Sequence, residues 1–163
     1  MGSYLRMGGS LLTLAALALL PRCLVKTESC TDIGCGRAFG VELARSAWAP
    51  ATYQVKVTAD GLATSCTLSL PFSSCSSLVQ CDRAEPGFLV ETAGCALPAA
   101  QQQILGVVWP VSGPASVTIE VLQDGVSLGT GSYQPTYTSS RPNGEDCEPT
   151  CSQAQLQPTL SLP

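Results

Sequence analysis

Cysteine is the residue type whose number and spacing indicate a defined chemistry in this sequence. The chain contains nine cysteines. Structural zinc sites typically use paired cysteines at C-x₂₋₄-C spacing, and no C-x₂-C pair occurs here. The closest pairs are Cys30-x₄-Cys35, Cys75-x₅-Cys81 and Cys147-x₃-Cys151. Behind the N-terminal export signal described below, this spacing favours disulfide bonds over a metal site.

An odd number of cysteines leaves one without a partner. Cys23 directly follows the apolar N-terminal segment, at the position where bacterial lipoproteins carry their lipid, so we interpret Cys23 as a lipidation site. The other eight are then enough for four disulfides. These eight are Cys30, Cys35, Cys66, Cys75, Cys81, Cys95, Cys147 and Cys151.

The pairing is only partly indicated by position. Cys66 alternates with Leu68 and Leu70, which places it on the inward face of a strand, and we predict a bridge from Cys66 to Cys95 inside the core. Cys75 and Cys81 bracket a serine-rich loop, which predicts a local bridge. Cys147 and Cys151 either pair with each other or reach back to Cys30 and Cys35.

Several catalytic arrangements are excluded by composition. The chain has no histidine, which excludes Ser-His-Asp and Cys-His catalysis and histidine-bearing zinc sites. Residues 125–129 match G-x-S-x-G, but they follow a hairpin turn, so we interpret the match as chance. Neither Lys26 nor Lys56 is placed to activate a serine, and the carboxylates are scattered. We therefore predict no catalytic residue, no cofactor and no enzymatic activity.

Two further groups of residues have a functional and a structural interpretation. Glu145, Asp146 and Glu148 offer oxygen ligands to calcium, but a solvated acidic turn is favoured and no metal site is predicted. An exposed pair of aromatic side chains would suit a sugar or a peptide, but packing in the core and at sheet edges is favoured. The large aromatics are Trp48, Tyr53, Trp109, Tyr133 and Tyr137.

Length and charge define the class of protein further. The 163 residues are 45% hydrophobic and only 12% charged, which is typical of one folded domain rather than of a disordered chain. The formal net charge is −4, with eight lysines and arginines in total. An acidic chain with so few cations is a poor nucleic-acid binder, so we predict no nucleic-acid partner.

The N-terminus predicts export. Residues 1–22 combine a basic Arg6 with a leucine-rich apolar stretch, which is typical of a signal peptide. The segment Leu20-Pro21-Arg22-Cys23 ends in the expected lipidated cysteine, although Pro21 and Arg22 stand where small residues are usual. A cut after Ala16-Leu17-Ala18, which gives a secreted form without lipid, is the alternative.

The sequence that follows the predicted signal peptide predicts an all-β protein. Alternation of apolar and polar residues predicts half-buried strands, with Asp-Gly hairpin turns at Asp60-Gly61 and Asp124-Gly125. We expect about seven antiparallel strands over residues 37–138, little helix, and a single disulfide-stabilised, immunoglobulin-like antiparallel β-sandwich. The expected strands cover residues 39–44, 53–58, 66–70, 87–92, 103–109, 117–121 and 126–134.

The expected organisation has four parts. Residues 1–22 are the signal peptide, 23–36 a tether, 37–151 the sandwich with its cysteine-bearing C-terminal turn, and 152–163 a disordered tail. The tail prediction rests on a stretch of Gln, Leu, Ser and Pro without a pattern.

The placement of cysteines and turns resembles a set of uncharacterised, cysteine-rich predicted lipoproteins from myxobacterial genomes. The resemblance covers residues 30–154 and implies an envelope-exposed, disulfide-stabilised domain with no assigned activity. The segments that carry it are residues 48–55, 59–61, 94–98, 124–125, 141–144 and 147–151.

These observations predict an exported protein of the bacterial cell envelope. We expect it to be anchored in the outer membrane or at the cell surface through the lipid on Cys23, or otherwise secreted, and to act as a non-enzymatic structural or binding module for a protein or glycan ligand. One alternative is a secreted carboxylate-dependent enzyme or an accessory domain of one. Another is an extracytoplasmic metal-binding module. A concave pocket that gathers two or more carboxylates would favour the enzyme.

Overall fold

The computed structural model of the protein describes residues 30–163. The predicted signal peptide and Cys23 lie outside this range. Over the described residues the regular structure is almost entirely β, and the one exception is a short 3₁₀ turn, Ala99–Gln101. No helix in this part of the chain has the length and apolarity needed to cross a membrane.

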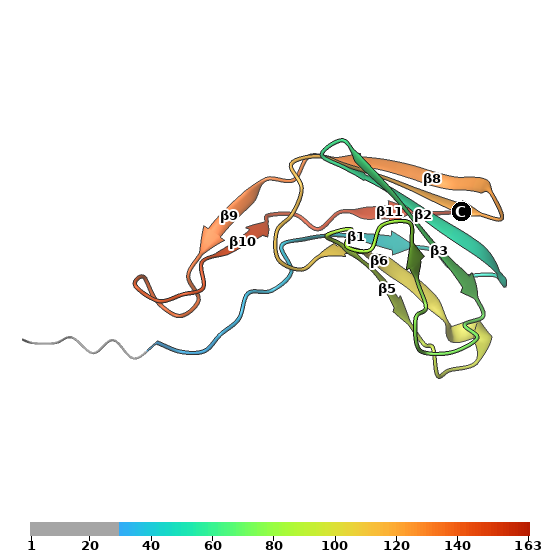
Figure 1. The fold of residues 1–163 in the computed structure, drawn as a ribbon, viewed down its shortest axis with the longest axis horizontal. Coiled ribbons are helices and arrows are strands. Elements are labelled where there is room, and N and C mark those ends of the chain that lie inside the picture. Colours follow the sequence, from blue (N-terminus) through green and yellow to red (C-terminus); the bar gives the residue numbers. More distant parts are fainter. Residues whose placement is uncertain (1–29) are drawn as a thin grey trace, which may run out of the picture.

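The strands form two main sheets and one separate hairpin (Figure 1). The first sheet has the order β11 (Thr159–Ser161), β1 (Phe39–Ala44), β6 (Gln103–Trp109), β5 (Leu89–Ala93). The second has the order β4 (Gln80–Cys81), β3 (Leu62–Leu70), β2 (Ala51–Ala59), β7 (Val117–Gln123), β8 (Val126–Tyr133). The hairpin pairs β9 (Tyr137–Ser140) with β10 (Cys151–Ala154).

One hydrophobic core joins the two main sheets in a sandwich-like arrangement. Alternate residues of each strand point inward, as strand geometry requires, so Val41 from the first sheet and Val55 from the second belong to the same buried cluster. Trp109 contacts Phe39 and Phe88 at ring-centroid distances of 5.5 Å. The largest fully buried side chains are those of Tyr53, Phe39, Ile104 and Ile119.

The sequence-based prediction of an all-β, disulfide-stabilised fold is confirmed. Each of the seven expected strands corresponds to an observed one, namely β1, β2, β3, β5, β6, β7 and β8. Both Asp-Gly turns are present as well. Asp60 and Gly61 have φ values of 47° and 81°, and Asp124 and Gly125 have 49° and 83°. Left-handed conformation at both central residues is what a tight two-residue hairpin requires.

The finer description of the sandwich needs correction. The pairing is not purely antiparallel, because β1 and β11 are parallel. The short strands β4 and β9 to β11 were not expected. The immunoglobulin-like order is not confirmed either. Immunoglobulin constant domains place their first two strands in one sheet, whereas β1 and β2 lie in different sheets here.

The prediction of a disordered tail at residues 152–163 is wrong. β10 runs on to Ala154, and β11 pairs with β1 through the register Leu43↔Leu160. Leu160 and Leu162 are buried in the core, and the Leu162 amide donates to the Ala44 carbonyl over 2.8 Å. Leu160 and Leu162 alternate with polar residues, so both side chains point into the core and hold this short strand at the edge of the first sheet.

Two of the predicted disulfides are also wrong. Cys66 is bonded to Cys81, not to Cys95, and Cys75 is bonded to Cys95, not to Cys81. The inward position of Cys66 is correct, since its side chain is fully buried. The reason for the error is β4. This two-residue strand pairs with β3 in the register Cys66↔Cys81, which sets the two cysteines directly opposite each other.

The remaining four cysteines form two long-range bridges. Cys30 is bonded to Cys147 and Cys35 to Cys151, which confirms the alternative in which the C-terminal cysteines reach back to the N-terminal ones. They attach residues 30–36, an exposed arm without strand structure, to the loop and strand that follow β9. The predicted tether is therefore fixed to the fold along its described part.

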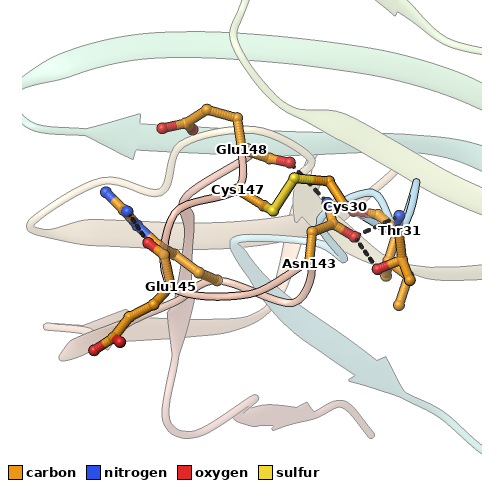
Figure 2. Close-up of a disulfide and its surroundings, with 8 residues drawn as sticks. Cys30, Thr31, Asn143, Glu145, Cys147 and Glu148 are labelled. Atoms are coloured by element: carbon orange, nitrogen blue, oxygen red, sulfur yellow. Dashed lines mark hydrogen bonds between the residues drawn. A yellow bond between two sulfur atoms is a disulfide. The ribbon is translucent and has the colours of Figure 1, made fainter. Parts of the chain in front are cut away.

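We call residues 30–36 together with residues 137–154 the clasp (Figure 1). Asn143 is the polar centre of the clasp (Figure 2). Its Oδ1 accepts from the Thr31 hydroxyl and the Ile33 amide, both over 2.8 Å. Its Nδ2 donates to the carbonyls of Ile33, over 3.0 Å, and Glu148, over 2.8 Å. One side chain thus joins the arm to the loop that carries Cys147.

Candidate functional site

The residues that the sequence singled out for chemistry are spread over the fold. Gly125–Gly129 forms a hairpin turn and the start of edge strand β8, with no following helix, so the G-x-S-x-G match has no nucleophile elbow. Lys56 lies on the outer face of β2, where its Nζ is 3.6 Å from a carboxylate oxygen of Glu120. Lys26 lies outside the described residues.

In the acidic turn, one carboxylate and one backbone carbonyl accept hydrogen bonds from within the turn. A carboxylate oxygen of Glu148 accepts from the Thr150 amide over 2.8 Å, and the Arg141 guanidinium donates to the Glu145 carbonyl (Figure 2). Among residues 30–163, no three His, Cys, Asp or Glu side chains are arranged to hold a metal ion.

The aromatic side chains mainly build the core, as favoured above. Trp48, Tyr53 and Trp109 are buried, while Tyr133 and Tyr137 are half-buried. The Tyr137 hydroxyl donates to the Pro114 carbonyl over 2.8 Å. Burial, with a smaller contribution from the negative charge of Asp60, raises the pKa of Tyr137 above its usual value.

A concave surface lies on the outer face of the first sheet. It is an open cleft of about 680 Å³ over β1 and β6. β1 directs Val41 and Leu43 into the core, so Gly40, Glu42 and Ala44 face the opposite way, toward the cleft. We call this surface the sheet cleft. Its polar lining comes mainly from Arg37, Glu42, Arg45, Glu91, Gln103 and Gln157.

Two glycines define the floor of the sheet cleft. A Cβ at Gly106 would lie 2.5 Å from the Val41 carbonyl oxygen, so only glycine lets β6 approach β1 this closely. A Cβ at Gly40 would lie 3.0 Å from the side-chain oxygen of Gln157 and 3.5 Å from the Arg37 guanidinium. The floor is therefore low, and polar side chains extend over it.

The walls carry hydrogen-bonding groups of both charges. Arg37 is 3.5 Å from the carboxylate of Glu91, in an exposed ion pair. Glu42 accepts from the Thr159 hydroxyl at 3.5 Å. One end of the cleft is formed by Trp48 and Arg45, and the Arg45 guanidinium lies 5.4 Å from the centre of the Trp48 ring. Such a lining can donate to and accept from several hydroxyl groups at once.

The sheet cleft also brings two carboxylates together. Glu42 and Glu91 both line it, and the register sets them on either side of Gly106. Two inter-strand spacings separate their Cα atoms, or roughly 10 Å. The sequence by itself indicated no carboxylate pair. Glu42 does stand at a polar position of an alternating run, but its proximity to Glu91 follows from the strand order β1-β6-β5, which no local pattern encodes.

Comparison with protein-family models, with curated proteins and with solved structures finds no match to this chain. The four disulfides do indicate the compartment. Because such bonds form and persist in oxidising surroundings, they suggest an extracytoplasmic location.

Proposed function

We propose that the protein is an exported, non-enzymatic binding module of the bacterial cell envelope, and that the sheet cleft binds a glycan. The observation that carries this proposal is an open cleft of about 680 Å³, lined by side chains of both charges, on the outer face of the first sheet. Ligand sites are typically concave, largely preformed and equipped with a few well-placed polar groups.

The lining favours a glycan over an apolar ligand. Carboxylates such as Glu42 and Glu91 accept from sugar hydroxyls, and Arg37 and Arg45 donate to them. A rigid strand scaffold also reduces the ordering cost of binding.

The test is a binding screen of the purified, disulfide-bonded chain on an oligosaccharide array, followed by calorimetry with the best binder. Arg37→Ala should weaken binding about tenfold or more, because it removes a charge-assisted donor from the cleft wall. Lys56→Ala is the matched control. It also removes a cation from a cross-strand ion pair, but on the outer face of the other sheet. Equal affinities for the two variants, or no binding to any glycan, would refute the proposal.

A second candidate function is favoured by the carboxylate pair. Glu42 and Glu91 share the sheet cleft, as the acid and base of a glycosidase share an active site. Mass spectrometry of the bound glycan separates the two candidates. A glycan that stays intact supports the binding module. A glycan that is shortened, and that stays intact with Glu42→Gln or Glu91→Gln, supports the enzyme.

We further propose that the lipid on Cys23 attaches this module to the outer membrane or the cell surface, in a grouping with the cysteine-rich lipoproteins named above. The even number of the other cysteines, all of them paired, supports this role for Cys23. Intact mass should show acyl chains on Cys23, and Cys23→Ser should release the protein from membranes. Unchanged mass and partitioning in that variant would favour the secreted form.

A further inference from the structure

The two main sheets differ in how their edges are protected. An exposed edge strand presents unpaired amides and carbonyls that can pair with another strand, and proteins usually block such edges. In the first sheet, β11 is only three residues long, and β5 carries a register shift at Glu91/Thr92 and the Arg37–Glu91 ion pair. In the second sheet, β4 has two residues, and Asp82 caps the neighbouring Ser65 amide over 3.0 Å.

Edge strand β8 lacks these forms of protection. It is eight residues long, it contains no charged residue and no proline, and every residue is at least partly exposed. Within residues 30–163, β7 is the only strand that pairs with β8. A register shift near Leu128 disturbs its first half, which leaves Gly129–Tyr133 as a regular five-residue stretch with a free edge.

The distribution of charged side chains indicates which partner can pair with the free edge of β8. Residues 30–163 carry five basic and eleven acidic side chains, so two copies of the protein repel each other over most of their surface. β8 is a neutral strip, and the adjacent C-terminal segment 156–163 is also uncharged. Two copies can therefore approach closely along this strip without bringing like charges together.

We propose that β8 pairs with β8 of a second copy of this chain, antiparallel, about a two-fold axis at Gly131. The two five-strand sheets then become one continuous sheet. Side chains of a strand stand roughly perpendicular to the sheet, so the two backbones can meet edge to edge at the axis, and Thr130 of each copy lies opposite Ser132 of the other. An isologous contact of this kind closes on itself as a dimer.

The apolar side chains at the two ends of β8 fit the same arrangement. Val126 is 68% exposed at the start of the strand. At the other end, an apolar pocket of about 330 Å³ is lined by Tyr133, Pro135 and Leu156, among others. Antiparallel pairing centred on Gly131 sets Val126 of one copy beside residues 135 and 136 of the other. Each copy thus supplies one exposed valine and one pocket.

The dimer would present its sheet clefts in one direction. A two-fold axis between antiparallel strands stands perpendicular to the sheet, so it keeps both first sheets on the same side. If the sheet cleft binds a glycan, which is the proposed function above, a polymeric glycan can engage both clefts, and avidity exceeds the affinity of one site. The dimer itself does not depend on that function.

Sedimentation equilibrium of the purified, disulfide-bonded chain tests the pairing without any ligand. The contact is small, so we expect a weak dimer with a dissociation constant below about 1 mM. Thr130→Lys should weaken the dimer at least about tenfold, because two-fold symmetry brings two lysines into proximity. An equimolar mixture of Thr130→Lys and Thr130→Glu should restore association, which misfolded variants would not do.

Thr58→Lys is the matched control, because Thr58 is exposed on the same outer face but on the central strand β2. It should leave the dimer unchanged. The proposal is overturned if the unaltered chain is monomeric up to about 1 mM, if Thr130→Lys dimerises as well as the unaltered chain, or if the control dissociates equally. Failure of glycan binding with an intact dimer would refute only the proposed function.

Discussion

The sandwich and the clasp share one chain but are stabilised by different interactions. The sandwich buries a continuous set of apolar side chains contributed by both main sheets. In the clasp, the buried residues are Asn143, Cys147 and Cys151, none of which belongs to that core. Within the clasp, Tyr137 and Ala154 of the β9–β10 hairpin also pack against this core. The sandwich and the hairpin therefore depend on the hydrophobic effect, whereas the arm at residues 30–36 depends on two disulfides and one amide side chain.

This difference gives the oxidising compartment a specific structural role. A segment with little apolar surface to bury cannot offset the entropy of ordering its backbone. Residues 30–36 are such a segment, since all of them are exposed. Without the Cys30–Cys147 and Cys35–Cys151 bonds, we expect the arm to detach while the sandwich persists. The part of the fold nearest the proposed anchor is thus the part that needs oxidation most.

The largest effect is expected when both bridges of the clasp are removed. They connect nearly the same two points of the chain, with sequence separations of 117 and 116 residues. While one bridge remains, the other closes a ring of only about ten residues, so its loss costs about 2–3 kcal/mol. The second removal then opens the long loop and costs about 2 kcal/mol more than the first. Denaturant unfolding of the two paired Cys→Ser variants and of the quadruple variant measures this difference.

The other two bridges provide the control. Cys66–Cys81 and Cys75–Cys95 close loops with separations of 15 and 20 residues. Neither disulfide shortens the loop that the other one closes. The losses in the free energy of unfolding on removing each bridge should therefore add up when both are removed. Additive losses in the clasp, or loss of the β spectrum in its quadruple variant, would contradict the contrast between the two regions.

The sequence predicts the sandwich better than it predicts the clasp or the cleft. Alternation and Asp-Gly turns are local signals, and they predict β2, β3, β7 and β8 with their hairpins. The bridge Cys66–Cys81 depends on a two-residue strand, which is too short to show any period. β11 was missed for the same reason. The carboxylate pair in the sheet cleft depends on strand order, which is set by long-range pairing.

The smallest effect concerns the polar centre of the clasp. Asn143→Ala removes four hydrogen bonds and leaves the amide and carbonyl of Ile33 without their partner. We expect a loss of about 2 kcal/mol, because each lost hydrogen bond contributes about 0.5–1.5 kcal/mol net. The bridges limit the change to the arm. Hydrogen exchange at the Ile33 amide should therefore accelerate more than exchange in β2.

Asn143→Asp distinguishes the hydrogen bonds from the shape of the side chain. Aspartate fills the same volume and still accepts from Thr31 and Ile33 through Oδ1. Its second oxygen, however, replaces a donor that faces the carbonyls of Ile33 and Glu148. An ionised carboxylate there repels both carbonyls, so this variant should be at least as destabilised as Asn143→Ala at neutral pH.

The carbonyls of Ile33 and Glu148 also favour the protonated form of the new carboxyl, which can donate to one of them, so its folded-state pKa is raised. Stability should then rise as the pH falls through that value. Exchange at Ile33 that is as slow in Asn143→Asp as in the unaltered chain at pH 7 would show that the shape of the side chain, rather than its donor, holds the arm.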